Sequence, residues 1–460
     1  MRRLSLQKMT LARKVSAMIL RRHLMTSQVS KSSTKEAMQS KQDDKENQKY
    51  PRKIFSGIQP TGQLHLGNYL GALQKWTEMQ NSGDDVCYCI VDMHSITIPQ
   101  NPALLRENIF EMAATMFACG LNPEKSTIYV QSTVKEHAEL GWILNCMCTM
   151  ARLGHLPQFK EKSRNLKDIP LGLYVYPVLQ AADIMLFKAT HVPVGEDQLQ
   201  HIQLTQHLSR IFNTKYGATF PICHAVIENH DAARIRSLRN PSKKMSKSDL
   251  DTKATINIRD PPEVIVEKIK KAVTDFTSDV TYEPNVRPGV SNLVVIHSMV
   301  TNTPIDKVVE EAKSIDTGRY KLRVADAVVE HLKPIRLAID DHLQRKDELI
   351  QLLEMGAEKA RQVAQENIVE IKQKIGLGIF QTIPQSIEVS SDLESTTSTT
   401  KENQEQQPGE MKIEDMSIVP KQKLRQEKKL NTTQTQQNLA PKFKLKDSIQ
   451  TPPSMVKKVS

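Results

Sequence analysis

With 460 residues, 39% of them hydrophobic and 5% aromatic, the chain is long enough for two or three domains. Its apolar runs are all shorter than the ~20 residues that span a bilayer, so no membrane partner is predicted. The formal net charge is +11, but residues 1–35 contribute +9 and residues 381–460 contribute +2, which leaves residues 36–380 neutral. The positive charge of the whole chain is therefore no sign that its central part binds nucleic acid.

The first segment, MRRLSLQKMTLARKVSAMILRRHLMTS, is rich in arginine, contains serine and has no acidic residue. Its basic residues at 13–14 and 21–22 alternate with apolar ones, which is typical of a mitochondrial transit peptide rather than a secretory signal. A disordered basic arm is the alternative. We predict that residues 1–50 are a transit peptide followed by an unstructured arm, and that the protein lies in the mitochondrial matrix.

From residue 53 onward, strand-like runs alternate with helical patterns. The strand-like runs are KIFSGI, VCYCIVD and STIYVQS, and the helical patterns cover residues 65–80, 102–119 and 136–150. A repeat of about 35–40 residues per strand and helix indicates βαβ units and a parallel sheet. The sequence therefore predicts the α/β class, with a Rossmann-type catalytic domain over residues 51–254.

The C-terminal half of the chain changes character after about residue 255. Apolar positions three and four apart predict helices over 261–275, 289–301, 304–315, 318–343 and 346–375. We predict an all-helical domain at 255–380. Residues 381–460 are rich in Ser, Thr, Gln and Lys and are predicted to be a disordered low-complexity tail.

Six cysteines are present, and two pairs have the spacing Cys-x-Cys. Neither pair has the CxxC spacing of a zinc or iron–sulfur site, and nothing else in the sequence suggests metal ligands. We expect buried free thiols and predict no metal-ligating residue.

A first motif lies in the stretch IFSGIQPTGQLHLGNYLG at residues 54–71, which begins like a strand, breaks at Pro60 and Gly62 and continues as a helix. A glycine-containing turn before a helix lets a ligand approach the backbone, and the helix dipole favours phosphate there. His65 and Asn68 add donors suited to phosphate or ribose oxygens. The turn matches neither GxGxxG nor GxxxxGK[ST], so an ordinary strand–turn–helix connection remains possible from this stretch alone.

A second motif, PSKKMSKSD at residues 241–249, joins the α/β half to the helical half. By itself it is compatible with a solvated basic loop or a phosphorylation site. At this position, however, a mobile loop could bring Lys244 and Lys247 onto a triphosphate bound at the first turn. Lysine side chains placed there stabilise the negative charge that develops on a leaving pyrophosphate.

The pair HLGN and KMSKS, about 180 residues apart, resembles the class I aminoacyl-tRNA synthetases. Within that class, residues 53–378 are similar to the mitochondrial and bacterial tryptophanyl-tRNA synthetases, through FSGIQPTG, CIVDMHSIT, QFKEK, YPVLQAADI, VPVGEDQLQH, KMSKSD, KAVTDF and PGVSNL. The resemblance implies ATP and Mg²⁺ for activation, tryptophan and tRNA(Trp) as substrates, and a homodimer. It also implies that the helical residues 255–380 bind the tRNA and its anticodon. The iron–sulfur site of some bacterial relatives is not expected, since no cysteine follows Cys223.

The resemblance also implies roles for individual residues. Lys244, Lys247 and the triphosphate-contacting Lys162 are the expected catalytic residues. The nucleotide site is expected to consist of Gln59, His65, Gly67, Asn68, Lys244, Met245, Ser246, Lys247 and Ser248. The tryptophan site is expected to consist of Phe55, Gly57, Gln59, His94, Tyr176, Asp183, Val192, Val194 and Gln198.

Asp183 is the expected acceptor of the indole N–H, the single donor on a large apolar ring system. It lies in the otherwise apolar run YPVLQAADIMLF, where a carboxylate must be paired or functional. Local pairing of Asp183 is the structural alternative. Tyr176 and Gln198 are expected to hold the amino group, and Gln59 and His94 to lie near the carboxylate and the bond being made.

Two of these assignments have plain alternatives, because His94 could be an ordinary half-buried histidine and Lys162 a solvated helix charge. The sequence also departs from the family at two places. Gln180 stands where many bacterial enzymes have Met, and Asp249 is followed by Leu250 where proline is common.

Three other functions remain open. A tyrosyl-tRNA synthetase shares the fold and chemistry, although its first turn usually reads GFDPTA and its later loop GGSDQWGN. A smaller adenylyltransferase uses a related HxGH turn but lacks KMSKS and a helical domain. A noncatalytic RNA-binding relative is the third, and the intact motifs speak against it.

Overall fold

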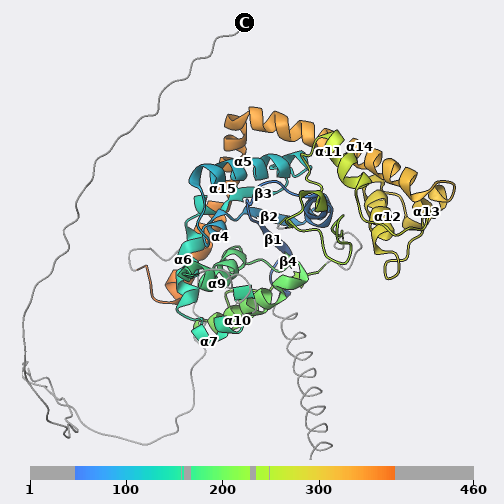
Figure 1. The fold of residues 1–460 in the computed structure, drawn as a ribbon. Coiled ribbons are helices and arrows are strands. Elements are labelled where there is room, and N and C mark those ends of the chain that lie inside the picture. The colour runs from blue at the N-terminus through green and yellow to red at the C-terminus, as the bar shows by residue number, and fades with distance from the viewer. Residues whose placement is uncertain (1–46, 157, 160–166, 228–234, 248, 379–460) are drawn as a thin grey trace, which may run out of the picture. The chain divides into compact units, whose positions relative to one another are not determined.

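The computed structural model describes residues 47–156, 158–159, 167–227, 235–247 and 249–378 (Figure 1). Most of the predicted transit peptide and the predicted tail, together with Lys162 and Ser248, lie outside these residues. Among the described residues, no helix is both long enough and apolar enough to cross a membrane.

The centre of the fold is a five-stranded parallel sheet with the strand order β3-β2-β1-β4-β5. Its strands are β1 (Lys53–Ile58), β2 (Asp85–Ile90), β3 (Thr127–Val130), β4 (His191–Pro193) and β5 (His224–Val226). The first three are the strands predicted from the sequence. The last two have three residues each, too few for an alternating pattern to reveal them. The predicted α/β class with a Rossmann-type parallel sheet is confirmed.

Alternate residues of the strands feed two separate hydrophobic cores. Ile54, Tyr88 and Ile128 face the core shared with α3 (Gln74–Asn81) and α5 (Pro102–Ala118). Phe55 and Tyr129 face the core shared with α6 (Glu136–Asn145), α9 (Leu171–Leu186) and α10 (Leu199–Tyr216). Since side chains of a strand point alternately to the two faces, helices cover both sides of the sheet.

The C-terminal half is helical, as predicted. It consists of α11 (Pro262–Lys270), α12 (Pro288–Thr301), α13 (Ile305–Ala312), α14 (Thr317–Gln344) and α15 (Lys346–Lys374). The first of these is shorter than the predicted 261–275. The predicted helix at 136–150 divides into α6 and α7 (Met150–Gly154).

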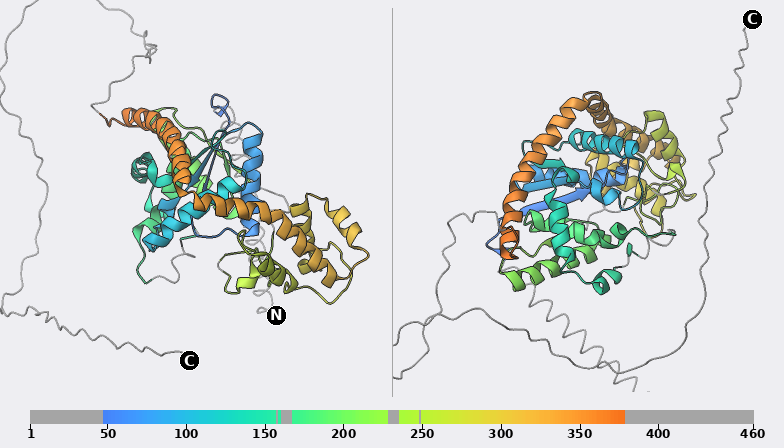
Figure 2. Two further views of the ribbon diagram at one scale, coloured as in Figure 1. Left: turned by 90° about the horizontal axis from the view of Figure 1, so that it is seen from above. Right: turned by 90° about the vertical axis from the view of Figure 1, so that its left-hand side faces the viewer.

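The last helix returns to the sheet instead of joining the other C-terminal helices. In Figure 2, α15 runs beside the sheet while α12 and α13 lie at the far end of α14. A Cβ on Gly356 would lie 1.8 Å from the carbonyl oxygen of Ile128, so α15 can contact the backbone of β3 only through a glycine. Residues 346–374 thus lie against the sheet, although they belong to the predicted helical domain. The predicted domain boundaries remain predictions.

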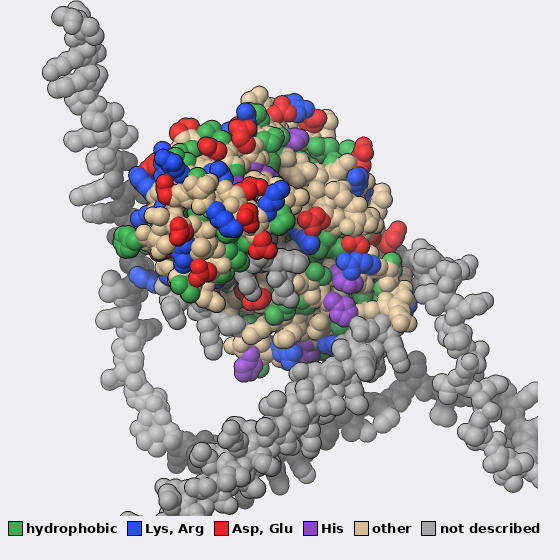
Figure 3. Space-filling model, turned by 90° about the vertical axis from the view of Figure 1, so that its right-hand side faces the viewer, with side chains coloured by type: hydrophobic (Ala, Val, Ile, Leu, Met, Phe, Trp, Pro, Cys, Tyr) green, Lys and Arg blue, Asp and Glu red, His purple; other side chains and the backbone are tan. Residues whose placement is uncertain are grey.

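The surface and the cysteines add two details. On the face that carries α12 and α13, Lys and Arg side chains are interspersed with Asp and Glu (Figure 3), in agreement with the neutral charge of residues 36–380. All six cysteines are free. Cys87, Cys89 and Cys223 are buried as expected and Cys119 and Cys148 are half-buried, but the expectation is wrong for Cys146, which follows the end of α6 and is exposed.

Candidate active site

A cavity of about 790 Å³ opens at the carboxyl ends of the strands, where the strand order reverses direction between β1 and β4. Ligands of open parallel sheets bind at such a reversal. All nine residues predicted to bind tryptophan line this cavity, and so do four of the predicted nucleotide-binding residues. The nine are Phe55, Gly57, Gln59, His94, Tyr176, Asp183, Val192, Val194 and Gln198, and the four are Gln59, Gly67, Asn68 and Lys244.

The inner end of the cavity is formed by Asp183 of α9, whose side chain is 2% exposed. Its Oδ2 lies 2.8 Å from His94 Nε2, and its Oδ1 accepts a hydrogen bond of 2.7 Å from Gln131 Nε2. His137 Nδ1 lies 2.7 Å from the same Oδ1, at ion-pair distance but off the direction of an in-line hydrogen bond. The local pairing considered for Asp183 is therefore present, and the carboxylate also faces the cavity.

This environment keeps Asp183 ionised. Burial by itself would raise its pKa, but His137 and then His94 outweigh it and hold the pKa of the carboxyl well below its usual range. An ionised carboxylate only accepts hydrogen bonds. The inner end of the cavity thus offers a fixed acceptor to a ligand that carries an N–H group.

A second polar group surrounds His201 of α10, which is 1% exposed. His201 Nδ1 lies 2.9 Å from both Gln180 Oε1 and Gln198 Oε1. The hydroxyl of Tyr176 donates to Gln158 Oε1 at 2.7 Å, and its ring meets His201 edge-on. Gln180, the residue that departs from the family pattern, is thus held by hydrogen bonding in the cavity wall.

The HLGN turn forms the outer side of the cavity. His65 caps the short helix α2 (Leu66–Asn68): its Nδ1 accepts from the Asn68 backbone N–H at 3.2 Å, and its own N–H donates to Asn68 Oδ1 at 3.4 Å. Burial first, and then Lys244 and Lys247, lower the pKa of His65 to about 4. A neutral ring that accepts at Nδ1 carries its hydrogen on Nε2, which can donate to a ligand oxygen.

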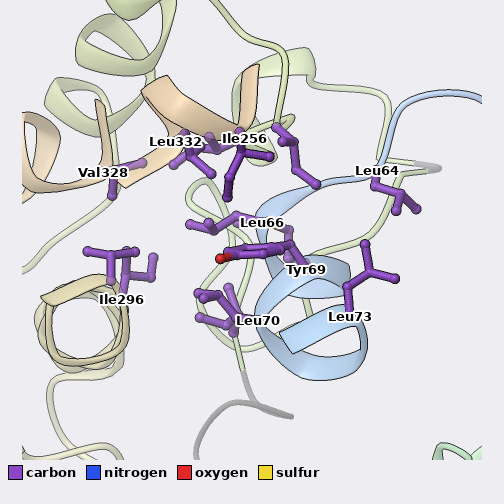
Figure 4. Packing of buried hydrophobic residues seen from close by; sticks show 14 of the residues in the cluster. Leu64, Leu66, Tyr69, Leu70, Leu73, Ile256, Ile296, Val328 and Leu332 are labelled. Carbon is purple, nitrogen blue, oxygen red and sulfur yellow. The ribbon is translucent and has the colours of Figure 1, made fainter. Parts of the chain in front are cut away.

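Hydrophobic packing holds this turn in place. A π-helical turn (Tyr69–Leu73) follows α2, and Leu66 and Tyr69 pack against Ile256 and Leu332 (Figure 4). The Tyr69 hydroxyl lies 2.9 Å from His331 Nε2 of α14. The first signature motif is therefore anchored on the C-terminal helices as well as on the sheet.

The KMSKS segment lies over the same turn. Met245 is 2% exposed in the hydrophobic core, and its N–H donates to the Ile235 carbonyl at 2.9 Å. Lys244, Ser246 and Lys247 are exposed. A Cβ on Gly62 would lie only 2.9 Å from Lys247 Nζ, so the ammonium group lies directly over the glycine of the first turn. Partial burial lowers the pKa of Lys247, against the opposing effect of Glu111.

The structure brings most of the predicted site together and adds residues that the sequence did not indicate. Lys244 lines the cavity, whereas Met245 is a buried anchor of the loop and does not line it. The residues missed are Tyr129, Gln131, His137, Gln158 and His201. Tyr129, Gln131 and His137 could have been noticed as polar side chains in the buried runs STIYVQS and EHAELGWIL. Asp183, the carboxylate to which they are linked, lies far along the chain.

Comparison with known proteins agrees with this geometry. Residues 46–333 match the family described as tRNA synthetases class I (W and Y). The chain belongs to this family. A tryptophan–tRNA ligase of Caldanaerobacter subterraneus subsp. tengcongensis is 43% identical over 326 residues, covering 71% of this chain and 98% of the relative.

Two solved structures of class I synthetases are similar to this one. The tryptophanyl-tRNA synthetase of Mycoplasma pneumoniae has 31% sequence identity and a TM-score of 0.63, covering 71% of this chain and 98% of that one. The tryptophanyl-tRNA synthetase of Campylobacter jejuni, complexed with ADP and tryptophane, has 30% identity and a TM-score of 0.63, covering 71% of this chain and 100% of that one. The predicted aminoacyl-tRNA ligase of the tryptophan type is thereby confirmed, and the tyrosyl alternative has less support. The roles of single residues stay predictions.

Proposed function

We propose that this chain joins tryptophan to tRNA(Trp) in mitochondrial translation. The observation that carries the substrate assignment is Asp183, an ionised and almost fully buried acceptor at the end of a cavity walled by Phe55, Val192 and Val194. Tryptophan has an apolar ring system with one N–H donor, and this combination of wall and acceptor matches it. A similar enzyme was solved with ADP and tryptophane, which supports the same occupants here.

The proposed reaction needs positioned groups rather than a side-chain nucleophile. The ionised carboxylate of tryptophan attacks the α-phosphorus of ATP; an O–P bond to the carboxylate forms, the bond to the bridging oxygen breaks, and pyrophosphate leaves. Lys244 and Lys247 stabilise the charge that develops on the leaving group, and His65 Nε2–H donates to a nucleotide oxygen. The terminal ribose of tRNA(Trp) then attacks the adenylate carbonyl, which forms the ester and releases AMP.

A magnesium ion is expected with the nucleotide. Among the described residues, no group of three or more His, Cys, Asp or Glu side chains is arranged to hold a metal ion. Mg²⁺ commonly binds through substrate phosphates and waters with few protein ligands. In this proposal, it neutralises triphosphate charge, while the lysines act on the leaving group.

A homodimer is part of the proposal. Three large apolar side chains on α6, α7 and α9 are more than two-thirds exposed: Trp142 at 72%, Met150 at 73% and Leu171 at 71%. Exposed apolar groups of this size on neighbouring helices are typical of a contact surface. Sedimentation measures the oligomeric state of the wild type and of Trp142→Glu. At the same concentration, the wild type should sediment as a dimer and the variant as a monomer.

The test of the activity is amino-acid-dependent ATP–pyrophosphate exchange on the full chain, with tryptophan and tyrosine compared side by side. Exchange with tryptophan alone is expected. Exchange with tyrosine alone would overturn the assignment of the pocket but keep the reaction class, and exchange with neither would contradict the proposed function.

The mitochondrial assignment has its own experiment. Residues 1–50, fused to a fluorescent reporter, should direct it into mitochondria and be removed there. A matched fusion in which Arg13, Lys14, Arg21 and Arg22 are changed to Gln should remain outside, because import depends on the basic face. Equal distribution of the two fusions would contradict the assignment.

A further inference from the structure

Behind Asp183, on the side away from the cavity, lies a continuous set of buried polar groups that the reaction does not use. Tyr129 of β3 and His137 of α6 are both 0% exposed, and the Tyr129 hydroxyl lies 2.8 Å from His137 Nε2. The other ring nitrogen of His137 lies 2.7 Å from Asp183 Oδ1. Neither Tyr129 nor His137 lines the cavity, so neither contacts a ligand there directly.

The direction of the hydrogen bonds in this set follows from the carboxylate. His137 Nδ1 and Asp183 Oδ1 lie 2.7 Å apart, and two unprotonated atoms would repel each other at this distance. An ionised carboxylate has no hydrogen, so the hydrogen is on His137 Nδ1. Burial raises the pKa of Tyr129 well above its usual range, so its hydroxyl keeps its proton. In the matching tautomer, Tyr129 O–H donates to His137 Nε2, and His137 Nδ1–H lies against Asp183 Oδ1, off the in-line direction.

The two oxygens of Asp183 are treated differently. Oδ1 is contacted by His137 and by Gln131, and the amide of Gln131 is itself oriented because its Oε1 accepts from the Met93 N–H at 3.2 Å. Oδ2 has His94 alone among the hydrogen-bond partners found in the described residues. A carboxylate oxygen has two lone pairs, so Oδ2 keeps one for a donor in the cavity.

Aromatic packing makes this arrangement rigid. Phe187 lies against both Tyr129 and His137, with ring centroids 5.9 and 5.7 Å apart, and it stacks on the cavity residue Phe55 at 5.7 Å. The His137 ring also stacks on Tyr129 at 5.8 Å. The groups that hold Oδ1 and the wall that contacts a ligand ring therefore belong to one packed unit.

We propose that Tyr129 and His137 are positioning residues for amino-acid selection: acting with Gln131, they hold Asp183 Oδ1 from behind so that Oδ2 is presented to the indole N–H. This inference rests on the proposed function, in which Asp183 receives that N–H. A held acceptor contributes to selection because the carboxylate need not be ordered when the substrate binds.

The experiment compares tryptophan with β-(benzothiophen-3-yl)alanine, in which sulfur replaces the indole N–H in a ring system of similar shape. Pyrophosphate exchange gives kcat/KM for both amino acids, and their ratio measures use of the N–H. The wild-type ratio should be large. His137→Leu should lower the ratio by about tenfold or more, and Tyr129→Phe, which removes only a hydroxyl, by about threefold.

Two further variants separate positioning from general damage. His137→Asn keeps a donor near the place of Nδ1, so its ratio should lie between those of the wild type and His137→Leu. Tyr320→Phe is the matched control, because Tyr320 is also buried and its hydroxyl also contacts a histidine, His297 Nδ1 at 3.3 Å, in the C-terminal helices. This control should lose stability as Tyr129→Phe does and keep the wild-type ratio.

The split between KM and kcat is the second readout. Asp183 contacts the ring rather than the reacting atoms, so the variants should raise KM for tryptophan, leave KM for ATP unchanged and alter kcat little. Equal loss of kcat/KM for both amino acids in His137→Leu and Tyr129→Phe would overturn the proposal in favour of a purely structural role. If His137→Leu does not fold, Tyr129→Phe, which keeps its ring packing, decides the same question.

Failure of this inference is distinguishable from failure of the proposed function. If the wild type exchanges with tryptophan but shows no preference over the benzothiophene analogue, Asp183 is not the indole acceptor and this inference is wrong, while the function stands. Absence of exchange with either amino acid contradicts the function itself.

Discussion

The two ends of the cavity are built on opposite principles. At the inner end, Asp183 is 2% exposed and contacted by three side chains, which themselves are packed or hydrogen-bonded. At the outer end, Lys244 and Lys247 are exposed on a loop that Met245 anchors in the core. Selection of a small substrate needs an acceptor that is already in place, whereas a triphosphate brings its own charge and can organise exposed lysines.

This comparison has a consequence for stability. At the inner end, the proposed acceptor is held by the same buried contacts that stabilise the fold, so damage there should affect both recognition and folding. At the outer end, the lysines contribute little to folding, so damage there should affect the rate alone. Four predictions test this difference.

The largest effect is expected for Asp183→Asn at the inner end. An amide turns one acceptor into a donor that faces His94 or Gln131, so kcat/KM for tryptophan should fall by about 10³-fold or more. Because the amide also breaks up the buried hydrogen bonds to His94 and Gln131, the free energy of unfolding should fall by about 3 kcal/mol. Exchange kinetics and denaturant unfolding measure the two losses. A loss of activity at wild-type stability would break the link between recognition and folding at this end.

The second effect is expected for Lys247→Ala at the outer end. Removing the ammonium group should lower kcat for activation by about 10²-fold, because in the proposed function it stabilises the leaving pyrophosphate. The dissociation constant for tryptophan, measured by calorimetry, and the melting temperature should stay close to those of the wild type. Parallel losses of tryptophan binding and activation would contradict the assigned role.

The third effect concerns pH and the outer end of the cavity, where His65 lies beside Lys244 and Lys247. The pKa of His65 is about 4 in the folded protein and its ordinary value is 6.5, so the unfolded chain binds the extra proton between these values. Stability therefore rises with pH through this window, and by linkage about 2 kcal/mol should be lost between pH 7 and pH 5. The His65→Asn variant keeps a capping side chain and should lack this loss.

Denaturant unfolding at the two pH values checks this third prediction. His155→Asn controls for the removal of a histidine, because His155 is exposed and does not line the cavity. If His65→Asn loses as much stability as the wild type between pH 7 and pH 5, the ring is not held neutral by burial and the two lysines.

The smallest effect is expected for Gln180→Met, which restores the residue common in bacterial relatives. His201 Nδ1 keeps Gln198 Oε1 as a partner at 2.9 Å, and Met has nearly the volume of Gln. KM for tryptophan should change by no more than about threefold, and stability should change by less than about 1.5 kcal/mol. A tenfold rise in KM would show that the polar wall around His201 takes part in recognition.

Much of this protein was readable from short stretches of sequence. KIFSGI, VCYCIVD and STIYVQS predicted three strands, because the alternation of a strand depends on residues close together in the chain. The pair HLGN and KMSKS predicted the reaction class through its resemblance to the class I synthetases. The resemblance to known synthetases named nine tryptophan-site residues, and in the structure all nine line one cavity. Lys162 and Ser248 lie outside the described residues, and their roles stay predictions.

Only the tertiary structure decided how the site is supported. Gln131 and His137 meet Asp183 from 52 and 46 positions away in the chain, Tyr129 reaches it through His137, and α15 returns to β3 through Gly356. Such long-range contacts depend on how whole helices and strands pack, and no local sequence pattern indicates which buried polar groups will be hydrogen-bond partners. The sequence by itself determined the elements, the motifs and the class of reaction; packing between distant elements determined which acceptor is held still and which lysines remain exposed.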